Sequence, residues 1–227
     1  MSASAIELTE TRSTGLLSTT NGKKAVMALS GVVLYGFVLV HMAGNLQIFL
    51  GPAVFNHYAE TLKATPPLLW GVRALLLTAV LAHIVSAVSL YMVKRAARPV
   101  GYVKLKPQVS SYASRTMYMS GPILLAFIIY HLLHFTVGVG GTAYDALDPY
   151  RNVIVGFRFP VVSGFYILSM GLLCLHLYHG VWSGFQSLGI SHPKYTPALR
   201  TFAKIFAIVV FLGFISVPIG VLTGLVA

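Results

Sequence analysis

The sequence predicts an all-α integral membrane protein, a bundle of five transmembrane helices. Hydrophobic residues make up 56% of the 227 positions and charged residues only 9%. The mean hydropathy is +0.79. Five apolar runs are each long enough to cross a bilayer, which takes about 20 residues in a helix. Such a composition is far from that of an ordinary globular domain and is typical of a multi-pass membrane protein.

The five predicted spans cover residues 24–50, 67–93, 117–139, 159–186 and 201–225. Glycine and proline mark the boundaries between spans, as at Gly51, Pro66 and Pro160. We expect residues 22–227 to form one membrane domain. Residues 1–21 are polar and rich in Ser and Thr, so we expect a polar N-terminal tail and no signal peptide.

Basic residues predict the orientation of the chain, whose formal net charge is +11. With a cytoplasmic N-terminus, the inner segments hold Arg12, Lys23, Lys24, Lys94, Arg95, Arg98, Lys104, Lys106, Arg115, Lys194, Arg200 and Lys204. The outer segments hold only Lys63, Arg73, Arg151 and Arg158. Because cytoplasmic loops carry the excess of Lys and Arg, we predict a cytoplasmic N-terminus and an outside C-terminus. Topology accounts for the positive charge, and we expect no nucleic-acid partner.

Six of the eight histidines lie inside predicted spans, where an ionisable side chain is costly and indicates a functional site. At a rise of about 1.5 Å per residue, His41 and His131 fall in the outer half of the membrane, and His83 and His176 in the inner half. Helix bundles build cofactor sites from such inward-facing side chains. The depths therefore predict two stacked sites, each clamped by two imidazoles.

The available ligands point to haem iron. No span carries a central acidic residue, and Cys174 is the only cysteine, which we expect to serve packing. This disfavours a carboxylate-rich di-iron site and a thiolate cluster. Neutral imidazole on both faces of a flat macrocycle suits low-spin haem iron, which carries electrons. Gly36, Gly44 and Gly180 lie near the predicted ligands and would let a large ring approach the backbone.

The remaining histidines are expected to play other roles. His134 and His179 each follow a predicted ligand by three residues, which places them nearer the membrane surface. We expect them either to bond haem propionates or a quinone, or to make a simple interhelical hydrogen bond. His57 and His192 fall in loops, where a surface role is expected.

Four motifs surround these histidines: H-M-A-G-N-L-Q-I-F at 41–49, F-N-H-Y-A at 55–59, Y-H-L-L-H-F at 130–135 and H-L-Y-H-G-V-W-S-G-F-Q-S-L-G at 176–189. In order and spacing they resemble the cytochrome b558 type of succinate dehydrogenase (complex II) membrane-anchor subunit. The last motif is the most specific of the four. The resemblance covers residues 22–227.

The resemblance implies a five-helix anchor that binds two stacked haems b. By motif position, the axial ligands would be His41 with His131 and His83 with His176. The partners would be a flavoprotein subunit with FAD and an iron–sulfur subunit, docked on the cytoplasmic face of a bacterial inner membrane. The chain would pass electrons between the iron–sulfur subunit and a quinone, for which we expect menaquinone. Succinate chemistry would take place on the flavoprotein, so we expect no catalytic residue for it here.

Polar residues near both membrane surfaces are candidates for the quinone site. The outer candidates are Gln47, Tyr58 and Arg73, of which Arg73 is also a candidate propionate partner. The inner candidates are Ser30, Trp182 and Gln186. Each is alternatively an interfacial or helix-capping residue, since Trp and Tyr are common at membrane interfaces.

Two further functions fit parts of the pattern. A haem b subunit of another membrane-bound dehydrogenase, of the hydrogenase or formate dehydrogenase type, would share the paired histidines, although the W-S-G-F-Q-S-L-G segment argues against it. A transporter with a histidine proton relay would need intramembrane acids or broken helices near the midplane. No predicted span carries a central acid.

Overall fold

The structure is a computed structural model that describes residues 15, 18–97, 100, 111–139 and 144–227. Within these residues the chain forms seven α-helices, one 3₁₀ turn (η2) and one π turn (η3). In chain order they are α1 (Thr20–Leu46), η2 (Gln47–Leu50), α2 (Pro52–Lys63), α3 (Pro66–Ala96), α4 (Tyr112–Leu132), η3 (Leu133–Val137), α5 (Pro149–Phe157), α6 (Pro160–Ser187) and α7 (Thr196–Leu222). The all-α prediction is confirmed. Most of the predicted tail, and the basic residues Arg12, Arg98, Lys104 and Lys106, lie outside the described residues.

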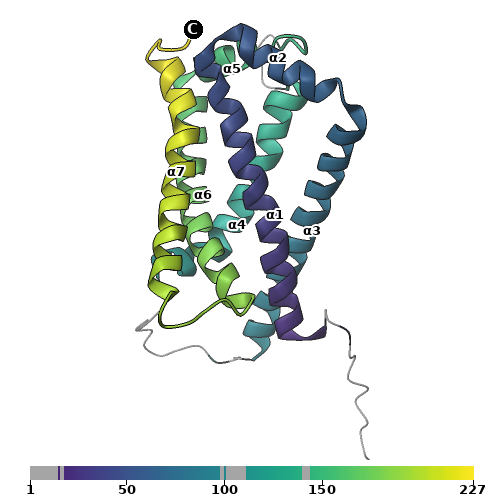
Figure 1. The fold of residues 1–227 in the computed structure, drawn as a ribbon, viewed down its shortest axis with the longest axis vertical. Coiled ribbons are helices and arrows are strands. Elements are labelled where there is room, and N and C mark those ends of the chain that lie inside the picture. The colour runs from purple at the N-terminus through teal and green to yellow at the C-terminus, as the bar shows by residue number, and fades with distance from the viewer. Residues whose placement is uncertain (1–14, 16–17, 98–99, 101–110, 140–143) are drawn as a thin grey trace, which may run out of the picture.

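The long helices run side by side, as Figure 1 shows. We call the end where α1 begins the lower end, and the end with α2, α5 and the C-terminus the upper end. In the part of the chain that is described, five helical segments are long and apolar enough to cross a membrane: Thr20–Leu50, Pro66–Ala96, Tyr112–Val137, Pro160–Ser187 and Thr196–Leu222. The five predicted spans are confirmed, and they indicate a multi-pass membrane protein.

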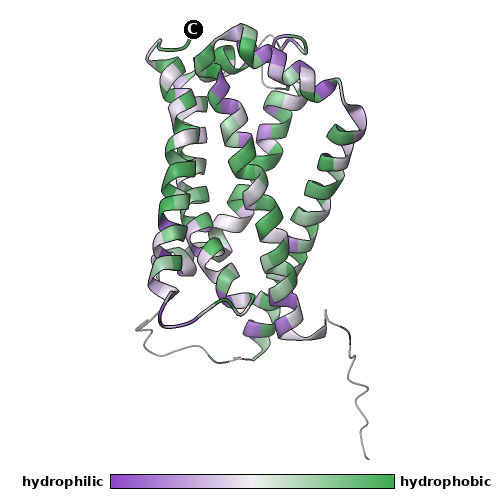
Figure 2. Ribbon diagram, in the orientation of Figure 1, coloured by the Kyte–Doolittle hydropathy of each residue, from purple (hydrophilic) through white to green (hydrophobic). Residues whose placement is uncertain are grey.

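The outside of the bundle is apolar, as a lipid-facing surface requires. Figure 2 shows hydrophobic residues along the long helices and hydrophilic ones concentrated near the two ends. Leu77 and Val85 on α3 are 62% and 66% exposed. Helices that are hydrophobic all round and yet exposed belong in a bilayer rather than in water.

Two spans begin about five residues before the predicted position. α4 begins at Tyr112, where the Ser111 hydroxyl accepts a hydrogen bond from the backbone N–H of Ser114 at 3.1 Å. α7 begins at Thr196, with Pro197 in its first turn. Caps and N-terminal prolines decide where a helix starts. Hydropathy detects only the apolar part of each helix and therefore places the start too late.

The short helices α2 and α5 were not predicted. Gly51 has φ of +94°, a conformation that favours glycine, and it turns the chain from η2 into α2. Asp148 caps α5 by accepting a hydrogen bond from the backbone N–H of Arg151 at 3.0 Å. Both helices are shorter than a span and carry polar residues, so they leave no strong signal in a hydropathy profile.

The two short helices are joined to each other at the upper end. The Asn56 amide on α2 donates to the Asp148 carboxylate at 2.9 Å, and its oxygen accepts from the backbone N–H of Tyr150 at 2.9 Å. The Tyr150 hydroxyl donates to the backbone oxygen of Ala227 at 3.2 Å. These bonds tie α2, α5 and the C-terminus into one cap over the bundle.

The packing of the long helices sets the positions of the histidines. α1 packs against α3, α6 and α7, while α6 also packs along α7 and against α4. Among the described helices, neither α1 and α4 nor α3 and α6 share an extended packing contact. The larger apolar core, around Ile48, Phe127 and Tyr166, lies towards the upper end.

Candidate functional site

Four histidines form two pairs across the bundle. His41 on α1 faces His131 on α4, with ring centres 5.8 Å apart and ring planes at 79°. His83 on α3 faces His176 on α6, with ring centres 6.2 Å apart and ring planes at 54°. The structure thus brings together the same pairs that the membrane depths predicted. We call His41 and His131 the upper pair, and His83 and His176 the lower pair.

The two pairs are stacked along the bundle axis. Ser30, on α1, contacts His83 of the lower pair, and His41 of the upper pair lies eleven residues further along the same helix. Eleven residues of helix span about 16 Å. The same count separates Ser120, which contacts His176, from His131 on α4. The pairs are therefore separate sites rather than one cluster.

Each pair joins helices that share no extended packing contact. α1 and α4 approach one another through the rings of His41 and His131, and α3 and α6 through the rings of His83 and His176. An added Cβ at Gly36 or Gly180 would meet no atom within 4 Å. Space beside these backbones is what a large flat ligand needs.

The ring spacing fits a metal ion between the imidazoles. A coordinating imidazole nitrogen lies about 2 Å from a first-row metal, and the ring centre lies about 1 Å beyond it. Two imidazoles on opposite sides of one metal therefore have ring centres about 6 Å apart. Both pairs match this spacing. No group of three or more His, Cys, Asp or Glu side chains suited to a metal occurs among the described residues, so each pair could supply at most two such ligands.

Hydrogen bonds fix the ring orientation of His83. Its Nδ1 lies 3.1 Å from the backbone oxygen of Met27. A carbonyl oxygen only accepts, so Nδ1 carries the proton and Nε2 keeps its lone pair. The Ser30 hydroxyl donates to the backbone oxygen of Val26 at 2.7 Å and lies 3.3 Å from the same Nδ1. The serine oxygen therefore accepts from His83. An Nδ1–H bond of this kind is what usually orients a metal-binding histidine.

His176 is held in the same way. Its Nδ1 lies 3.3 Å from the hydroxyl of Ser120. That hydroxyl donates to the backbone oxygen of Met117 at 3.4 Å, so its oxygen is free to accept. When the serine oxygen accepts, Nδ1 of His176 carries the proton and Nε2 keeps its lone pair. Both Nδ1 contacts are compatible with the tautomer that can coordinate a metal through Nε2.

The upper pair has different partners. Nδ1 of His131 lies 3.5 Å from the Tyr166 hydroxyl, which lies 3.1 Å from Nδ1 of His134. One hydroxyl can accept from His131 and donate to His134. The Asn45 amide nitrogen donates to the backbone oxygen of His41 at 2.7 Å and lies 3.4 Å from both of its ring nitrogens. The rings of the upper pair are therefore less firmly oriented by hydrogen bonds than those of the lower pair.

The secondary histidines take different positions. His134 is buried and makes the interhelical hydrogen bond that was one of its two predicted roles. His179 is partly buried on α6, one turn beyond His176. Arg73 is exposed on α3, where its guanidinium lies 4.9 Å from the centre of the Trp70 ring.

The inner quinone candidates do not converge on one site. Ser30 lies against His83, as described above. Trp182 lies under Arg200, whose guanidinium is 4.6 Å from the ring centre. Gln186 is exposed near the end of α6. The three predicted inner residues therefore lie in different surroundings and do not form one pocket among the described residues.

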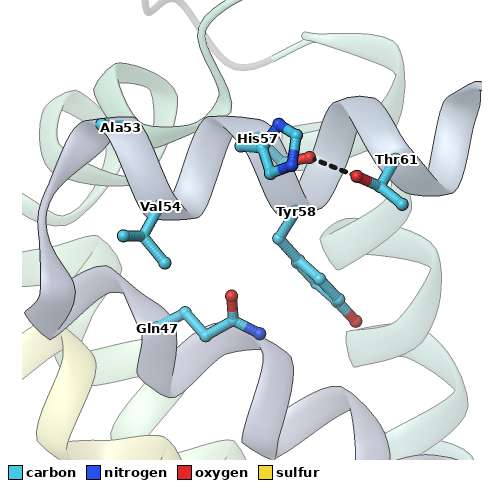
Figure 3. A pocket seen from close by; sticks show the side chains of 6 residues that line it. All are labelled: Gln47, Ala53, Val54, His57, Tyr58 and Thr61. Carbon is cyan, nitrogen blue, oxygen red and sulfur yellow. Dashed lines mark hydrogen bonds between the residues drawn. The ribbon is translucent and has the colours of Figure 1, made fainter.

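Two outer candidates share a pocket. It has a volume of about 440 Å³ and is lined by Gln47, Ala53, Val54, His57, Tyr58 and Thr61. Figure 3 shows the Gln47 amide and the Tyr58 ring on the η2 and α2 sides of this space, with Thr61 donating to the His57 backbone oxygen. His57, predicted as a loop residue, is exposed on α2 beside them.

Gly44 has a different role from the predicted one. An added Cβ at this position would lie 2.7 Å from the hydroxyl oxygen of Tyr58. Gly44 therefore makes room for Tyr58 rather than for a macrocycle. The contact also places Tyr58 one helical turn from His41, so the pocket adjoins the upper pair.

Sequence reasoning missed Ser120, Tyr166 and Asn45 as partners of the paired histidines. A signal for Ser120 was present, because a Ser-Gly pair precedes His131 by eleven residues and another precedes His41 by the same distance. Tyr166 and Asn45 leave no comparable signal. Their roles depend on which helices meet.

The fold and the paired histidines define a multi-pass, all-α membrane protein with two stacked candidate metal sites. Comparison with protein-family models, with curated proteins and with solved structures finds no match to this chain. The function is therefore argued from the geometry of the site and the motifs of the sequence.

Proposed function

We propose that this chain is the di-haem cytochrome b membrane-anchor subunit of a succinate:quinone oxidoreductase. The observation that carries the proposal is the geometry of the two pairs: ring centres 5.8 and 6.2 Å apart, with Nδ1 of three rings at a hydrogen-bonding oxygen. A bound haem b supplies one-electron redox chemistry at each pair. The motifs around these histidines, which resemble the anchor subunit, support the choice of enzyme.

The residues of the pairs would hold and orient the haems without leaving an open coordination position. His83 and His176 present Nε2 to the lower site, and His41 and His131 take the corresponding place at the upper site. Two protein ligands per iron leave no position for a substrate, which suits electron transfer. The chain would then carry electrons along its axis and leave succinate chemistry to a flavoprotein.

The lower end is suited to the partner subunits. Its described basic residues are Lys23, Lys24, Lys94, Arg95, Arg115, Lys194, Arg200 and Lys204. This excess supports a cytoplasmic lower end. The iron–sulfur and flavoprotein subunits would dock there, nearest to His83 and His176.

The pocket at the upper end supports a quinone site near His41. Gln47 and Tyr58 provide a hydrogen-bond donor each for quinone carbonyl oxygens, and Ala53 and Val54 provide apolar contact. Menaquinone is the quinone that the family resemblance favours.

The test is the optical spectrum of the purified chain. Two b-type components in the reduced-minus-oxidised spectrum are expected, and His176→Leu should remove one of them while His131→Leu removes the other. His192→Gln, a change at an exposed histidine outside the spans, is the matched control and should keep both. A colourless wild-type protein would overturn the proposal.

A further inference from the structure

The first and third spans contain the same sequence pattern. Residues 27–41 align with residues 117–131 at a constant offset of 90 positions. The identical pairs are Met27 and Met117, Ser30 and Ser120, Gly31 and Gly121, Leu34 and Leu124, Phe37 and Phe127, and His41 and His131. The six identities in fifteen positions include a serine and a histidine, and histidine is rare inside a span.

The structure repeats in the same way. α1, α2 and α3 form one unit, and α4, α5 and α6 form a second, each with a short helix between two long ones. Both units begin at the lower end, and both short helices lie at the upper end, as Figure 1 shows. Parallel repeats related by an axis along the membrane normal occur in other membrane proteins.

Matched residues make matched contacts. The ring of Phe37 stacks on His41 with centres 5.2 Å apart, and that of Phe127 stacks on His131 with centres 6.0 Å apart. The upper pair is thus made of equivalent histidines, each supported by an equivalent phenylalanine one turn earlier on its own helix.

The equivalent serines support the lower pair. Ser30, on the first helix of its unit, accepts from Nδ1 of His83 on the last helix of that unit. Ser120 does the same for His176 in the second unit. The two serines are 7% and 2% exposed, and both use their own proton on a backbone oxygen of their own helix. Only a lone pair is then left for the imidazole.

We propose that Ser30 and Ser120 are equivalent positioning residues, and that the lower site is built from two copies of one serine–histidine unit. Each serine holds its histidine with Nε2 towards the shared site. The identity of the group held there rests on the proposed function. The hydrogen-bond partners at the upper site are not equivalent in this way. Tyr166, ten residues before His176, contacts His131. The residue ten positions before His83 is Arg73, whose side chain is exposed.

Replacing Ser120 should change the redox potential of the lower site more than replacing Ser30. An acceptor at Nδ1–H raises the basicity of a coordinating imidazole, which favours the ferric state. Without Ser30, His83 still has the Met27 oxygen at 3.1 Å. Without Ser120, His176 loses its hydroxyl acceptor. Ser120→Ala should therefore change the lower site more than Ser30→Ala.

The experiment is a redox titration of the full-length chain with bound haem, followed optically. The component that disappears in His176→Leu identifies the lower site. Ser120→Ala should raise the midpoint potential of this component by about 59 mV, which corresponds to a roughly tenfold change in the ferric-to-ferrous ratio for one electron. Ser30→Ala should raise the same component by less. Ser120→Thr, which keeps a hydroxyl, should restore most of the original value.

Ser169→Ala is the matched control. Ser169 is equally buried on α6, but its hydroxyl bonds only the Phe165 backbone oxygen among the described residues. Ser169→Ala should change the midpoint potential of neither b-type component. If Ser120→Ala loses the lower component while the upper one remains, the inference is also supported, since the upper component reports a folded bundle.

The inference is overturned if both components remain and neither serine change moves the lower one, or if the two changes move different components. Either result leaves the proposed function intact, because both haems are still bound. A wild-type chain without any b-type component would instead contradict the proposed function.

Discussion

The hydroxyl of Tyr166 on α6 lies 3.1 Å from Nδ1 of His134, which lies at the start of the π turn that follows α4. The same hydroxyl lies 3.5 Å from Nδ1 of His131. Tyr166 therefore connects a buried, non-paired histidine to the upper pair. This explains why His134 is buried at a point where neither a charge nor a free polar group would be tolerated.

Removing this hydroxyl should destabilise the protein. Tyr166→Phe leaves Nδ1 of the buried His134 without its partner, which costs about 1–3 kcal/mol of unfolding free energy. The measurement is unfolding in detergent. Tyr130→Phe is the control, because the described structure gives the Tyr130 hydroxyl no hydrogen bond, and its effect should stay within about 0.5 kcal/mol. Equal effects of the two changes would contradict the role of Tyr166.

The contact between α1 and α7 depends on the absence of a side chain at Gly213. A Cβ added there would overlap Sδ and Cγ of Met42. Gly213→Ala should therefore destabilise the bundle by about 1–3 kcal/mol, the usual cost of overpacking. Gly71→Ala, where an added Cβ meets no atom within 4 Å, should be neutral or stabilising. Thermal unfolding of the two variants tests the difference, which should shrink when Met42→Ala is combined with Gly213→Ala.

Asp148 should make the upper cap sensitive to acid. The Arg151 backbone N–H and then the Asn56 amide stabilise the carboxylate and lower the pKa of Asp148. A lowered pKa contributes stability above the unfolded value of about 3.9, and this contribution is lost as the pH falls through the folded pKa. Thermal stability should therefore drop below about pH 4.

Two substitutions separate the charge of Asp148 from its capping role. Asp148→Asn keeps an N-cap acceptor and should make the acid dependence weaker. Asp148→Ala removes the cap and should lower stability by about 1 kcal/mol at neutral pH. If Asp148→Asn retained the full acid dependence, another carboxylate would be responsible.

The pocket at the upper end predicts which side of the protein reduces quinone. Gln47→Leu or Tyr58→Phe should lower menaquinone reduction by the assembled complex about tenfold, the effect of losing roughly 1.4 kcal/mol of hydrogen bonding. Gln186→Leu, a matched change at the lower end, should leave the rate unchanged. A lower rate in Gln186→Leu alone would place the quinone at the opposite end, and both haem components should stay visible in all three variants.

The arrangement of the spans was predictable because a bilayer imposes simple rules on length and hydropathy. The depth of each histidine along its helix follows from residue counting. Those depths predicted which histidines pair, and the structure brings the same pairs together. The short helices α2 and α5 were missed because capping by Asp148 and the turn at Gly51 are local features of polar segments. The repeat of residues 27–41 at 117–131 was visible in the sequence, but its meaning required the serine contacts.

By itself, the sequence determined the five spans and the position of four histidines along their helix axes. It also showed that the spans hold no competing metal ligands. These features depend on order and spacing along single helices. The tertiary structure decided the partners of each imidazole. Ser30, Ser120 and Tyr166 hydrogen-bond histidines on other helices, 53, 56 and 35 positions away in sequence. Such contacts depend on how helices rotate and pack against one another. Hydropathy does not specify that rotation when every face of a helix is apolar.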